Sequence, residues 1–216
     1  NNHFKSSKQQ APKKANPGIE GKEIWVWLRL KILADIGIIG LPNAGKSSLL
    51  SALTNAKPKI GNYPYTTLTP QLGIIRNLEQ EVIISDIPGL IKDAHKGIGI
   101  GTRFLGHVER CKALIHVIDV TNKNPVYSFK TVIKELEEYG YNLINKNQIV
   151  IINKIDLVDK DILEKTLQKI KKYSNMKVYS CSALKKVGLK DITESLFNLI
   201  NKEKNVNKNK DEKWLP

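Results

Sequence analysis

One segment of the chain, GLPNAGKS, combines two glycines with a lysine and a serine in a pattern suited to holding a polyphosphate. Gly40 and Gly45 allow the backbone to curl so that successive N–H groups point inward, and the dipole of a following helix adds positive potential. Lys46 supplies a positive charge to the β- and γ-phosphates, and the Ser47 hydroxyl is an oxygen ligand for Mg²⁺. The spacing matches G-x-x-x-x-G-K-[ST] and predicts a phosphate-binding loop; the alternative is a plain glycine turn before a helix.

A second set of residues has the chemistry to complete a magnesium and phosphate site. Asp86 ends the apolar run EVIISD and can hold Mg²⁺ through water, while the amide of Gly89 can approach the γ-phosphate because no Cβ obstructs it. The polar loop between the two motifs contains the adjacent Thr66 and Thr67. Either threonine can complete the magnesium shell and sense the γ-phosphate, which predicts a switch loop ordered by the triphosphate.

A third motif, NKID, predicts which base the site recognises. The Asp156 carboxylate can accept two hydrogen bonds from the N1–H and N2–H₂ edge that guanine has and adenine lacks. Asn153 either contacts the base or ties this loop to the phosphate-binding loop, and the aliphatic stem of Lys154 can cover the ring. The backbone of Ser182 and Ala183, after a further apolar run, can hold the keto O6, so the motifs together predict a guanine nucleotide.

Short β-branched runs alternate with helical patterns, and these elements must position the motifs. Strands that are apolar throughout and alternate with helices predict an α/β fold with a mainly parallel six-stranded sheet flanked by helices. Ligands of such sheets bind beyond the carboxyl ends of the strands, where the three motifs begin. The predicted strands are 35–40, 71–76, 81–86, 113–119, 148–153 and 177–181, and the predicted helices are near 45–54, 101–110, 125–140, 160–173 and 188–202.

The two ends of the chain differ from this pattern. Residues 1–22 are polar with proline and glycine breakers, which indicates a linker or an arm, and the alternation in EIWVWLRLKIL predicts a strand over 23–33. The chain begins without methionine, so we expect a piece of a longer protein. The expected parts are the end of a truncated N-terminal domain or linker at 1–33, a nucleotide-binding domain at 34–202 and a polar tail or linker at 203–216.

Composition narrows the class of protein less than the motifs do. The 35 Lys and Arg residues outnumber the 21 Asp and Glu residues, and the net charge of +14 fits either solubility or a polyanionic partner such as RNA. Cys111 and Cys181 fit neither a metal site nor a disulfide framework, and no apolar run is long enough for a transmembrane helix. We therefore expect a reduced, cytoplasmic protein without a transmembrane segment. We also expect it to be monomeric.

In this order the motifs resemble those of the translation-factor-related GTPases, and the surrounding sequence resembles the Obg (CgtA) family. The likeness is carried by HFKSS, LRLKILADIGIIGLPNAGKSSLL, YPYTTLTPQLG, DIPGLIKDAHKGIGIGTRFLGHVERC and NKID, nearly end to end from residue 3 to 200. It implies a Ras-like G domain that binds GTP and GDP with Mg²⁺, hydrolyses GTP slowly and acts as a switch in large ribosomal subunit assembly and stress control. It also implies the large ribosomal subunit and rRNA as partners, a glycine-rich Obg domain that ends in residues 1–33, and a further domain after the G domain.

The resemblance also assigns site residues. It selects Thr67, the second threonine of YTT, to complete the magnesium ligands with Ser47 and Asp86. The implied nucleotide shell is Gly40, Leu41, Pro42, Asn43, Ala44, Gly45, Lys46, Ser47, Tyr65, Thr66, Thr67, Leu68, Thr69, Asp86, Ile87, Pro88, Gly89, Asn153, Lys154, Ile155, Asp156, Ser182, Ala183 and Leu184.

Catalytic roles are expected for Lys46, Thr67, Gly89 and Asn43. In related GTPases an asparagine at the position of Asn43 holds K⁺ where an arginine finger would lie; the alternative is a turn residue that bonds its own backbone. Leu90 stands where many GTPases place a glutamine that orients the attacking water, and leucine cannot position water.

Two other function classes stay open. An ATP-dependent enzyme such as a kinase shares the phosphate-binding loop, although NKID argues against it, and a titration of GDP against ADP separates the two. A basic RNA-binding module, in which nucleotide hydrolysis is incidental, predicts a steep salt dependence and an RNA affinity unchanged by GTP.

Two further features are assigned away from catalysis. Residues 101–110, with Arg103, His107 and Arg110, are interpreted as a switch helix that moves with the nucleotide. His116, within the apolar run ALIHVID, is interpreted as a core histidine with its hydrogen bonds satisfied and not as a general base.

Overall fold

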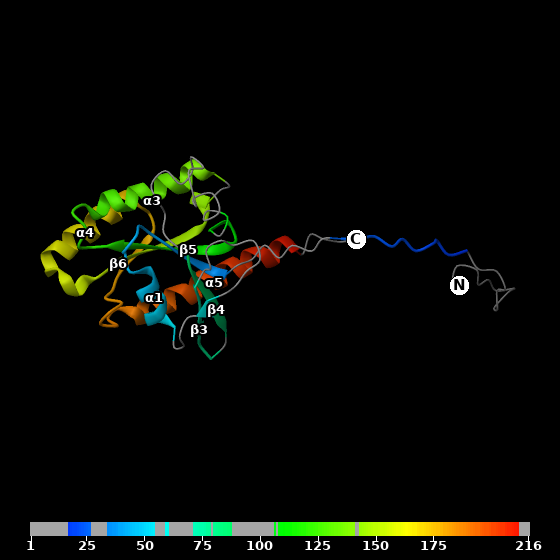
Figure 1. Cartoon of the computed structure of the whole chain (residues 1–216), viewed down its shortest axis with the longest axis horizontal. Helices are drawn as coiled ribbons and strands as arrows, with labels where there is room; N and C mark the ends of the chain where they lie inside the picture. The colour runs from blue at the N-terminus through cyan, green and yellow to red at the C-terminus, as the bar shows by residue number, and fades with distance from the viewer. Residues whose placement is uncertain are drawn as a thin grey trace. The chain divides into compact units, whose positions relative to one another are not determined.

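The chain divides into two units, Asn1–Leu30 and Lys31–Pro216, and a computed structural model describes part of each (Figure 1). Residues 17–26 of the first unit form no regular element, and the Trp25 side chain is fully exposed. The strand predicted over 23–33 is therefore wrong at 23–26, because no other strand pairs with these described residues. Residues 27–33 of the predicted strand lie outside the described residues. The described residues are 17–26, 34–54, 59–60, 71–78, 80–87, 106, 108–140 and 143–211, without the side chains of 59–60, 139 and 202–211.

The second unit is built on a seven-stranded sheet of order β2-β3-β4-β1-β5-β6-β7. All six predicted strands are present within two residues of their predicted ends, and the short β2 is added at one edge. β3 is antiparallel to β2 and β4, and the remaining pairs are parallel, so the mainly parallel sheet is confirmed. The strands are β1 (Ala34–Ile39), β2 (Lys59–Ile60), β3 (Gln71–Arg76), β4 (Glu81–Asp86), β5 (Cys111–Asp119), β6 (Asn147–Asn153) and β7 (Lys177–Ser180).

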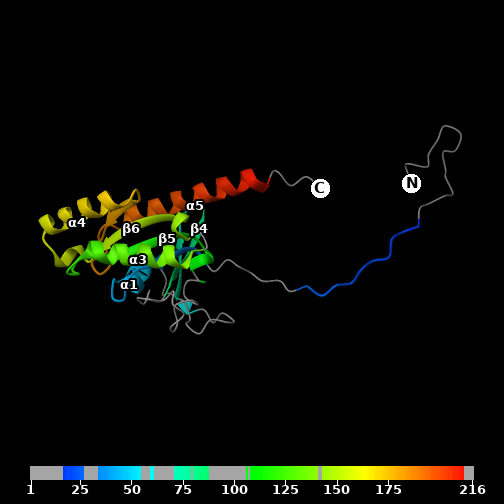
Figure 2. The ribbon, with the colours of Figure 1, turned by 90° about the horizontal axis from the view of Figure 1, so that it is seen from above.

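Helices cover both faces of the sheet. α3 begins where Pro125 occupies the first turn and the Asn124 side chain accepts a hydrogen bond from the Tyr127 amide at 3.0 Å. α5 continues past residue 202, and Figures 1 and 2 both show its last turns projecting beyond the sheet. Of the predicted helix over 101–110, residues 106, 108 and 109 are helical and most of the rest lies outside the described residues. The helices are α1 (Lys46–Leu53), α3 (Pro125–Tyr139), α4 (Lys160–Tyr173) and α5 (Leu189–Asp211), with short 3₁₀ turns η3 (Leu143–Asn145) and η4 (Ile155–Leu157).

Alternate residues of the central strands form the core on the two faces. In β5, Ile115 and Val117 pack in the cluster that α1 and α5 complete, whereas Leu114 and Ile118 pack in clusters that α3 and α4 complete. Figure 1 shows the same division, with α3 and α4 on one side of the sheet and α1 and α5 on the other. Because β5 is buried on both faces, six of its nine residues are apolar, with no alternation between apolar and polar positions.

His116 lies fully buried in β5 and stacks on Phe129 of α3, with ring centroids 5.1 Å apart. Its assignment to the core is confirmed, but neither ring nitrogen has a hydrogen-bond partner among the described residues. The predicted satisfaction of its hydrogen bonds is therefore wrong, because the side chain enters an apolar layer. Burial lowers the pKa of His116 to about 3.

Replacing His116 by leucine is expected to remove part of the acid sensitivity of folding. The unfolded imidazole takes up a proton below about pH 6.5, whereas the folded protein keeps His116 neutral to about pH 3, so stability falls as the pH drops through this window. Between pH 7 and pH 5 this linkage costs about 2 kcal/mol. Urea unfolding of both proteins at the two pH values measures it, and equal losses in both would contradict the burial of a neutral ring.

Candidate functional site

The carboxyl ends of four strands meet at one edge of the sheet and carry the predicted motifs. Ile38 of β1 pairs with Asp86 of β4, and Asp119 of β5 pairs with Asn153 of β6. Gly40, directly after β1, has a φ of 150°, and a Cβ there would collide with the carbonyl oxygen of β5. Glycine is therefore required at this position, where the chain turns out of β1 while in close contact with β5.

The segment after β1 folds around the ammonium group of Lys46. Lys46 Nζ donates to the carbonyl oxygens of Gly40 at 3.0 Å and Leu41 at 3.1 Å, and the residue is only 8% exposed. Burial lowers the pKa of Lys46, and the negative charge of Asp86 acts against that shift. The cation is thus held inside the loop, next to the first turn of α1.

The other residues of this loop set its backbone path. Gly45, with a φ of 89°, caps α1, and Ala44 donates to the Leu41 carbonyl oxygen at 3.3 Å. Asn43 has a left-handed φ of 61°, and the side chains of Pro42 and Asn43 are exposed. The strand, loop and helix that the sequence predicts around GLPNAGKS are therefore all present.

Ser47 and Asp86 supply oxygen donors beside Lys46. The Ser47 hydroxyl donates to Asp86 Oδ2 at 2.5 Å, while the buried Oδ1 has no partner among the described residues. Burial raises the pKa of Asp86, and the Ser47 hydrogen bond and the Lys46 charge oppose this. A hydroxyl next to a carboxylate with an unused buried oxygen fits a hard cation such as Mg²⁺, which prefers a few protein oxygens together with water.

Asn153 joins the phosphate-binding loop to the loop after β7. Its buried Nδ2 donates to the Ala44 carbonyl oxygen at 3.0 Å, and its Oδ1 accepts from the Ala183 amide at 3.0 Å. Of the two roles predicted for Asn153, the structure therefore has the tie between loops. A Cβ on Gly45 would collide with this amide, which explains glycine there.

Asp119 and Thr121 belong to this edge of the sheet, although the sequence interpretation did not include them. Lys154 Nζ donates to Asp119 Oδ2 at 2.5 Å, and the Thr121 amide and hydroxyl donate to Oδ1 at 2.8 and 2.6 Å. The sequence does contain a sign that Asp119 belongs to the site, because Asp119 ends an apolar strand just as Asp86 and Asn153 do. The site therefore contains an acidic partner for Lys154.

Asp156 lies in η4, half-buried beside the loop after β7. A hydrogen bond from the Ser182 hydroxyl lowers the pKa of Asp156, so the group is a carboxylate at neutral pH. The backbone amides of Ser182 and Ala183 are bonded to the Val187 carbonyl oxygen and to Asn153. Their contact with O6 of a guanine therefore stays a prediction.

The remaining predicted site residues fall into two groups. Ile87 donates to the Ile38 carbonyl oxygen at 3.3 Å and Ile155 to the Cys181 carbonyl oxygen at 3.3 Å, which holds both loops to the sheet, and Leu184 is 82% exposed. The predicted residues that lie outside the described part are Tyr65, Thr66, Thr67, Leu68, Thr69, Pro88 and Gly89, together with Leu90, Arg103 and His107.

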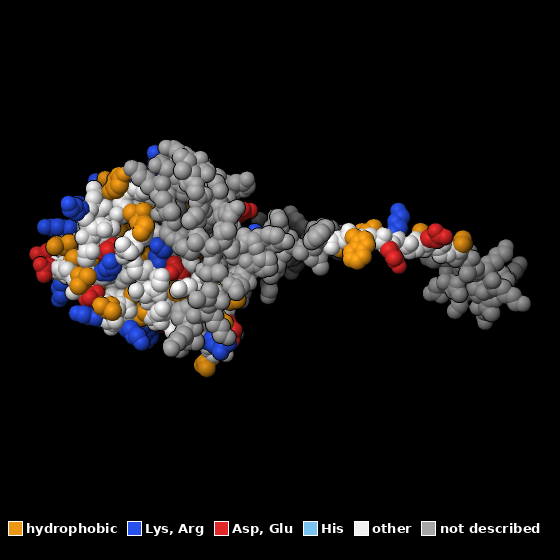
Figure 3. Space-filling model, viewed as in Figure 1, with side chains coloured by type: hydrophobic (Ala, Val, Ile, Leu, Met, Phe, Trp, Pro, Cys, Tyr) orange, Lys and Arg blue, Asp and Glu red, His pale blue; other side chains and the backbone are white. Residues whose placement is uncertain are grey.

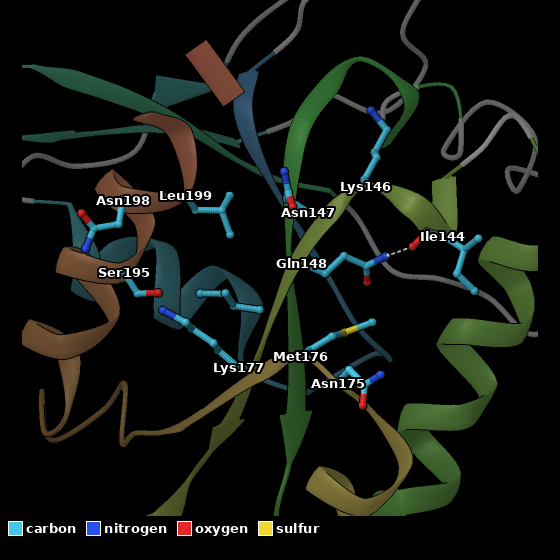
Figure 4. Close-up of a pocket in the computed structure, with 11 residues that line it drawn as sticks. Ile144, Lys146, Asn147, Gln148, Asn175, Met176, Lys177, Ser195, Asn198 and Leu199 are labelled. Atoms are coloured by element: carbon cyan, nitrogen blue, oxygen red, sulfur yellow. Dashed lines mark hydrogen bonds between the residues drawn. The ribbon is translucent and has the colours of Figure 1, made fainter. Parts of the chain in front are cut away.

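A cavity of about 400 Å³ lies near the starts of β6 and β7, away from the motifs (Figure 4). Gln148 donates from Nε2 to the Ile144 carbonyl oxygen at 3.1 Å, and its buried Oε1 has no partner among the described residues. Lys177 and Ser195 line the other side. Because parallel strands begin at the edge opposite their carboxyl ends, this cavity is separate from the predicted nucleotide site.

Charge on the visible face is mixed. Figure 3 shows Lys and Arg side chains interspersed with acidic ones over the described part of the second unit. This distribution does not single out an RNA-binding surface. Among the described residues, none of the helices combines the length and apolar composition needed to cross a bilayer.

Comparison with known sequences gives two findings. Residues 35–154 match the family model described as 50S ribosome-binding GTPase. The chain is also 49% identical over 199 residues to the GTPase Obg of Zymomonas mobilis subsp. mobilis, an alignment that covers 92% of this chain and 57% of that protein. The chain thus spans a little over half the length of this curated relative.

Similar solved structures include two from the iron transporter FeoB. The cytosolic domain of FeoB from L. pneumophila has a TM-score of 0.58 and 23% identity, and covers 76% of this chain and 67% of that one. The G domain of FeoB from T. maritima has a TM-score of 0.59 and 22% identity, and covers 76% of this chain and 96% of that one. At these identities the likeness shows the fold alone, which confirms the predicted P-loop G-domain architecture.

Proposed function

Because this chain belongs to the family of 50S ribosome-binding GTPases, we propose that it binds GTP and GDP with Mg²⁺ and hydrolyses GTP to GDP and phosphate. The observation that carries the proposal is the joining of the phosphate-binding loop and NKID by Asn153, which bonds both Ala44 and Ala183. These hydrogen bonds hold the phosphate-binding loop and the Asp156 carboxylate, which is suited to guanine, at the same edge of the sheet.

Each residue has a role in the proposed reaction. Lys46, held by the Gly40 and Leu41 carbonyl oxygens, turns its ammonium toward the β- and γ-phosphates when they enter the loop. Ser47 and Asp86, with Thr67, would hold Mg²⁺, whose charge offsets the negative charge that develops on the phosphates. The Gly89 amide would approach the γ-phosphate, and Thr67 would sense the same phosphate and thereby order its switch loop in the triphosphate state.

We propose that this chain is part of a cytoplasmic switch in large ribosomal subunit assembly and stress control, with the large subunit and rRNA as partners. Support comes from the family match over residues 35–154, the identity to a GTPase Obg and the net charge of +14. The charge supports only contact with a polyanion, whereas the family match points to the ribosome.

The deciding experiment measures GTP turnover by this chain with and without purified large ribosomal subunits, in K⁺ and in Na⁺. Turnover by the chain alone supports the enzyme, and faster turnover with subunits supports the partner. ADP that competes as well as GDP would indicate an ATP-dependent enzyme instead. RNA affinity that falls steeply with salt and ignores GTP, without turnover, would indicate the basic RNA-binding module.

K⁺ is expected to raise GTP hydrolysis by at least about tenfold over Na⁺, and Asn43→Ala should abolish the difference. Asn43 lies within the phosphate-binding loop, and its side chain, exposed on a left-handed backbone, carries the amide oxygen that a K⁺ ligand needs. Alanine strains a φ of 61°, so Asn43→Gly is the matched variant that removes the side chain while tolerating this backbone. Equal initial rates of the unsubstituted protein in the two salts would contradict the assignment.

A further inference from the structure

The side chain of Lys154 follows a defined path across the phosphate-binding loop. Lys154 has a left-handed φ of 67° and precedes η4. A Cβ built on Gly45 would lie 4.0 Å from Lys154 Cε, so the stem passes close to the loop backbone. From there Nζ reaches Asp119 Oδ2 at 2.5 Å, on the neighbouring strand.

Asp119 is itself held in place from both sides. It ends β5 in register with Asn153, and the Val120 amide that follows donates to the Asn153 carbonyl oxygen at 3.2 Å. The Thr121 amide and hydroxyl occupy Oδ1, so Oδ2 is left for Lys154. The Asp119 side chain is 9% exposed and that of Lys154 is 30% exposed, so solvent screens this pair only in part.

Asp119 is ionised, as an ion pair with Lys154 requires. Burial alone would raise its pKa, but the hydrogen bonds from Lys154 and Thr121 outweigh burial and the pKa of Asp119 is lowered. The group is therefore a carboxylate at neutral pH, and its bond to the ammonium is charge-assisted. The Lys154 side chain has four rotatable bonds, and the ion pair with Asp119 orders it before any nucleotide binds.

We propose that Asp119 is a positioning residue for purine binding: it fixes the stem of Lys154 as one wall of the base site without touching the nucleotide. The inference rests on the proposed function, since it takes NKID as the base-reading motif. It predicts that Asp119 contributes to the affinity for any purine nucleotide and leaves the choice among purines to Asp156. It also predicts that the contribution of Asp119 passes through Lys154 alone.

The test compares GDP affinity in Asp119→Asn, Lys154→Ala and the double variant of this chain, by titration with a fluorescent GDP analogue. Asparagine keeps the shape and can still accept from the Thr121 amide, but it loses the charge. Asp119→Asn is expected to weaken GDP and IDP binding equally, by about tenfold. In the Lys154→Ala background the same change should have no effect, because the residue it positions is gone.

Two controls separate positioning from a loss of folding. Asp161→Asn makes the same chemical change at an exposed position of α4, outside the site, and should leave GDP affinity within about twofold. Thermal melting followed by circular dichroism shows whether each variant is folded. A purely structural Asp119 would cost the same affinity in both Lys154 backgrounds, and that result overturns the inference.

The outcomes also distinguish this inference from the function on which it rests. If the unsubstituted chain binds no guanine nucleotide, both proposals fail together. If it binds GDP and Asp119→Asn binds GDP equally well, only the positioning role fails. If Asp119→Asn weakens GDP but not IDP, the residue reads the base and the positioning role fails as well.

Discussion

Lys46→Met is expected to lower single-turnover GTP hydrolysis by at least about a hundredfold while leaving the folded protein as stable as before or more so. The two effects differ in direction because Lys46 is only 8% exposed, and among the described residues its ammonium bonds only to carbonyl oxygens of its own loop. Burial lowers the pKa of Lys46, which means that the folded protein works against its charge. Methionine keeps the length of the stem and removes that cost.

The measurement pairs hydrolysis with urea unfolding in the absence of nucleotide. Lys169→Met, on an exposed position of α4, is the matched control and should change neither quantity. A loss of hydrolysis smaller than tenfold would contradict the phosphate role of Lys46. A parallel loss of stability would mean that the ammonium serves the fold of the loop instead of the ligand.

The fold of the second unit was predictable because the sheet is buried on both faces. A strand such as β6 has a continuous apolar run, Ile149–Ile152, and the helices between strands show one apolar side, so both patterns are visible in the sequence. The two-residue β2 and the extension of α5 beyond residue 202 have no such pattern. Both depend on neighbours in space or on backbone continuity, and neither could be predicted from hydrophobic periodicity.

The strand expected over 23–33 shows the limit of alternation as a signal. Alternating apolar and polar residues show only that a segment would fit a half-buried strand. The strand forms only where another strand supplies its hydrogen bonds. The described residues 23–26 have no such partner, and Ile24 and Trp25 are exposed.

Within the site, the motif residues were predictable and their partners were not. Lys46, Ser47 and Asp86 have fixed chemistry, so their spacing implies a use. Asp119 becomes part of the site only through its register with Asn153, which is a fact of strand pairing. The same holds for the Ala183 amide, which donates to Asn153 and not toward an open face.

The second large expected effect concerns the choice of base, which we propose depends on the Asp156 carboxylate. Asp156→Asn is expected to weaken GDP binding by at least about a hundredfold and to improve binding of xanthosine diphosphate by a similar factor. Asp156 is a carboxylate at neutral pH, and the hydrogen bond from Ser182 lowers its pKa further, so both oxygens can act as acceptors. An amide replaces one acceptor by a donor, which mismatches the guanine N2–H₂ group and matches the xanthine keto oxygen in its place.

Competition of GDP, xanthosine diphosphate and ADP against a fluorescent GDP analogue measures the exchange of preference. Asp159→Asn, three positions further along and exposed at the start of α4, makes the same chemical change outside the predicted contact and should leave all three affinities unchanged. Since Ser182 can donate to an asparagine oxygen as well as to a carboxylate, the loop keeps its shape and stability should stay constant. If Asp156→Asn binds GDP as tightly as the unsubstituted protein, this motif does not recognise guanine. If it binds all three nucleotides more weakly, the loop has collapsed and the base preference has not changed.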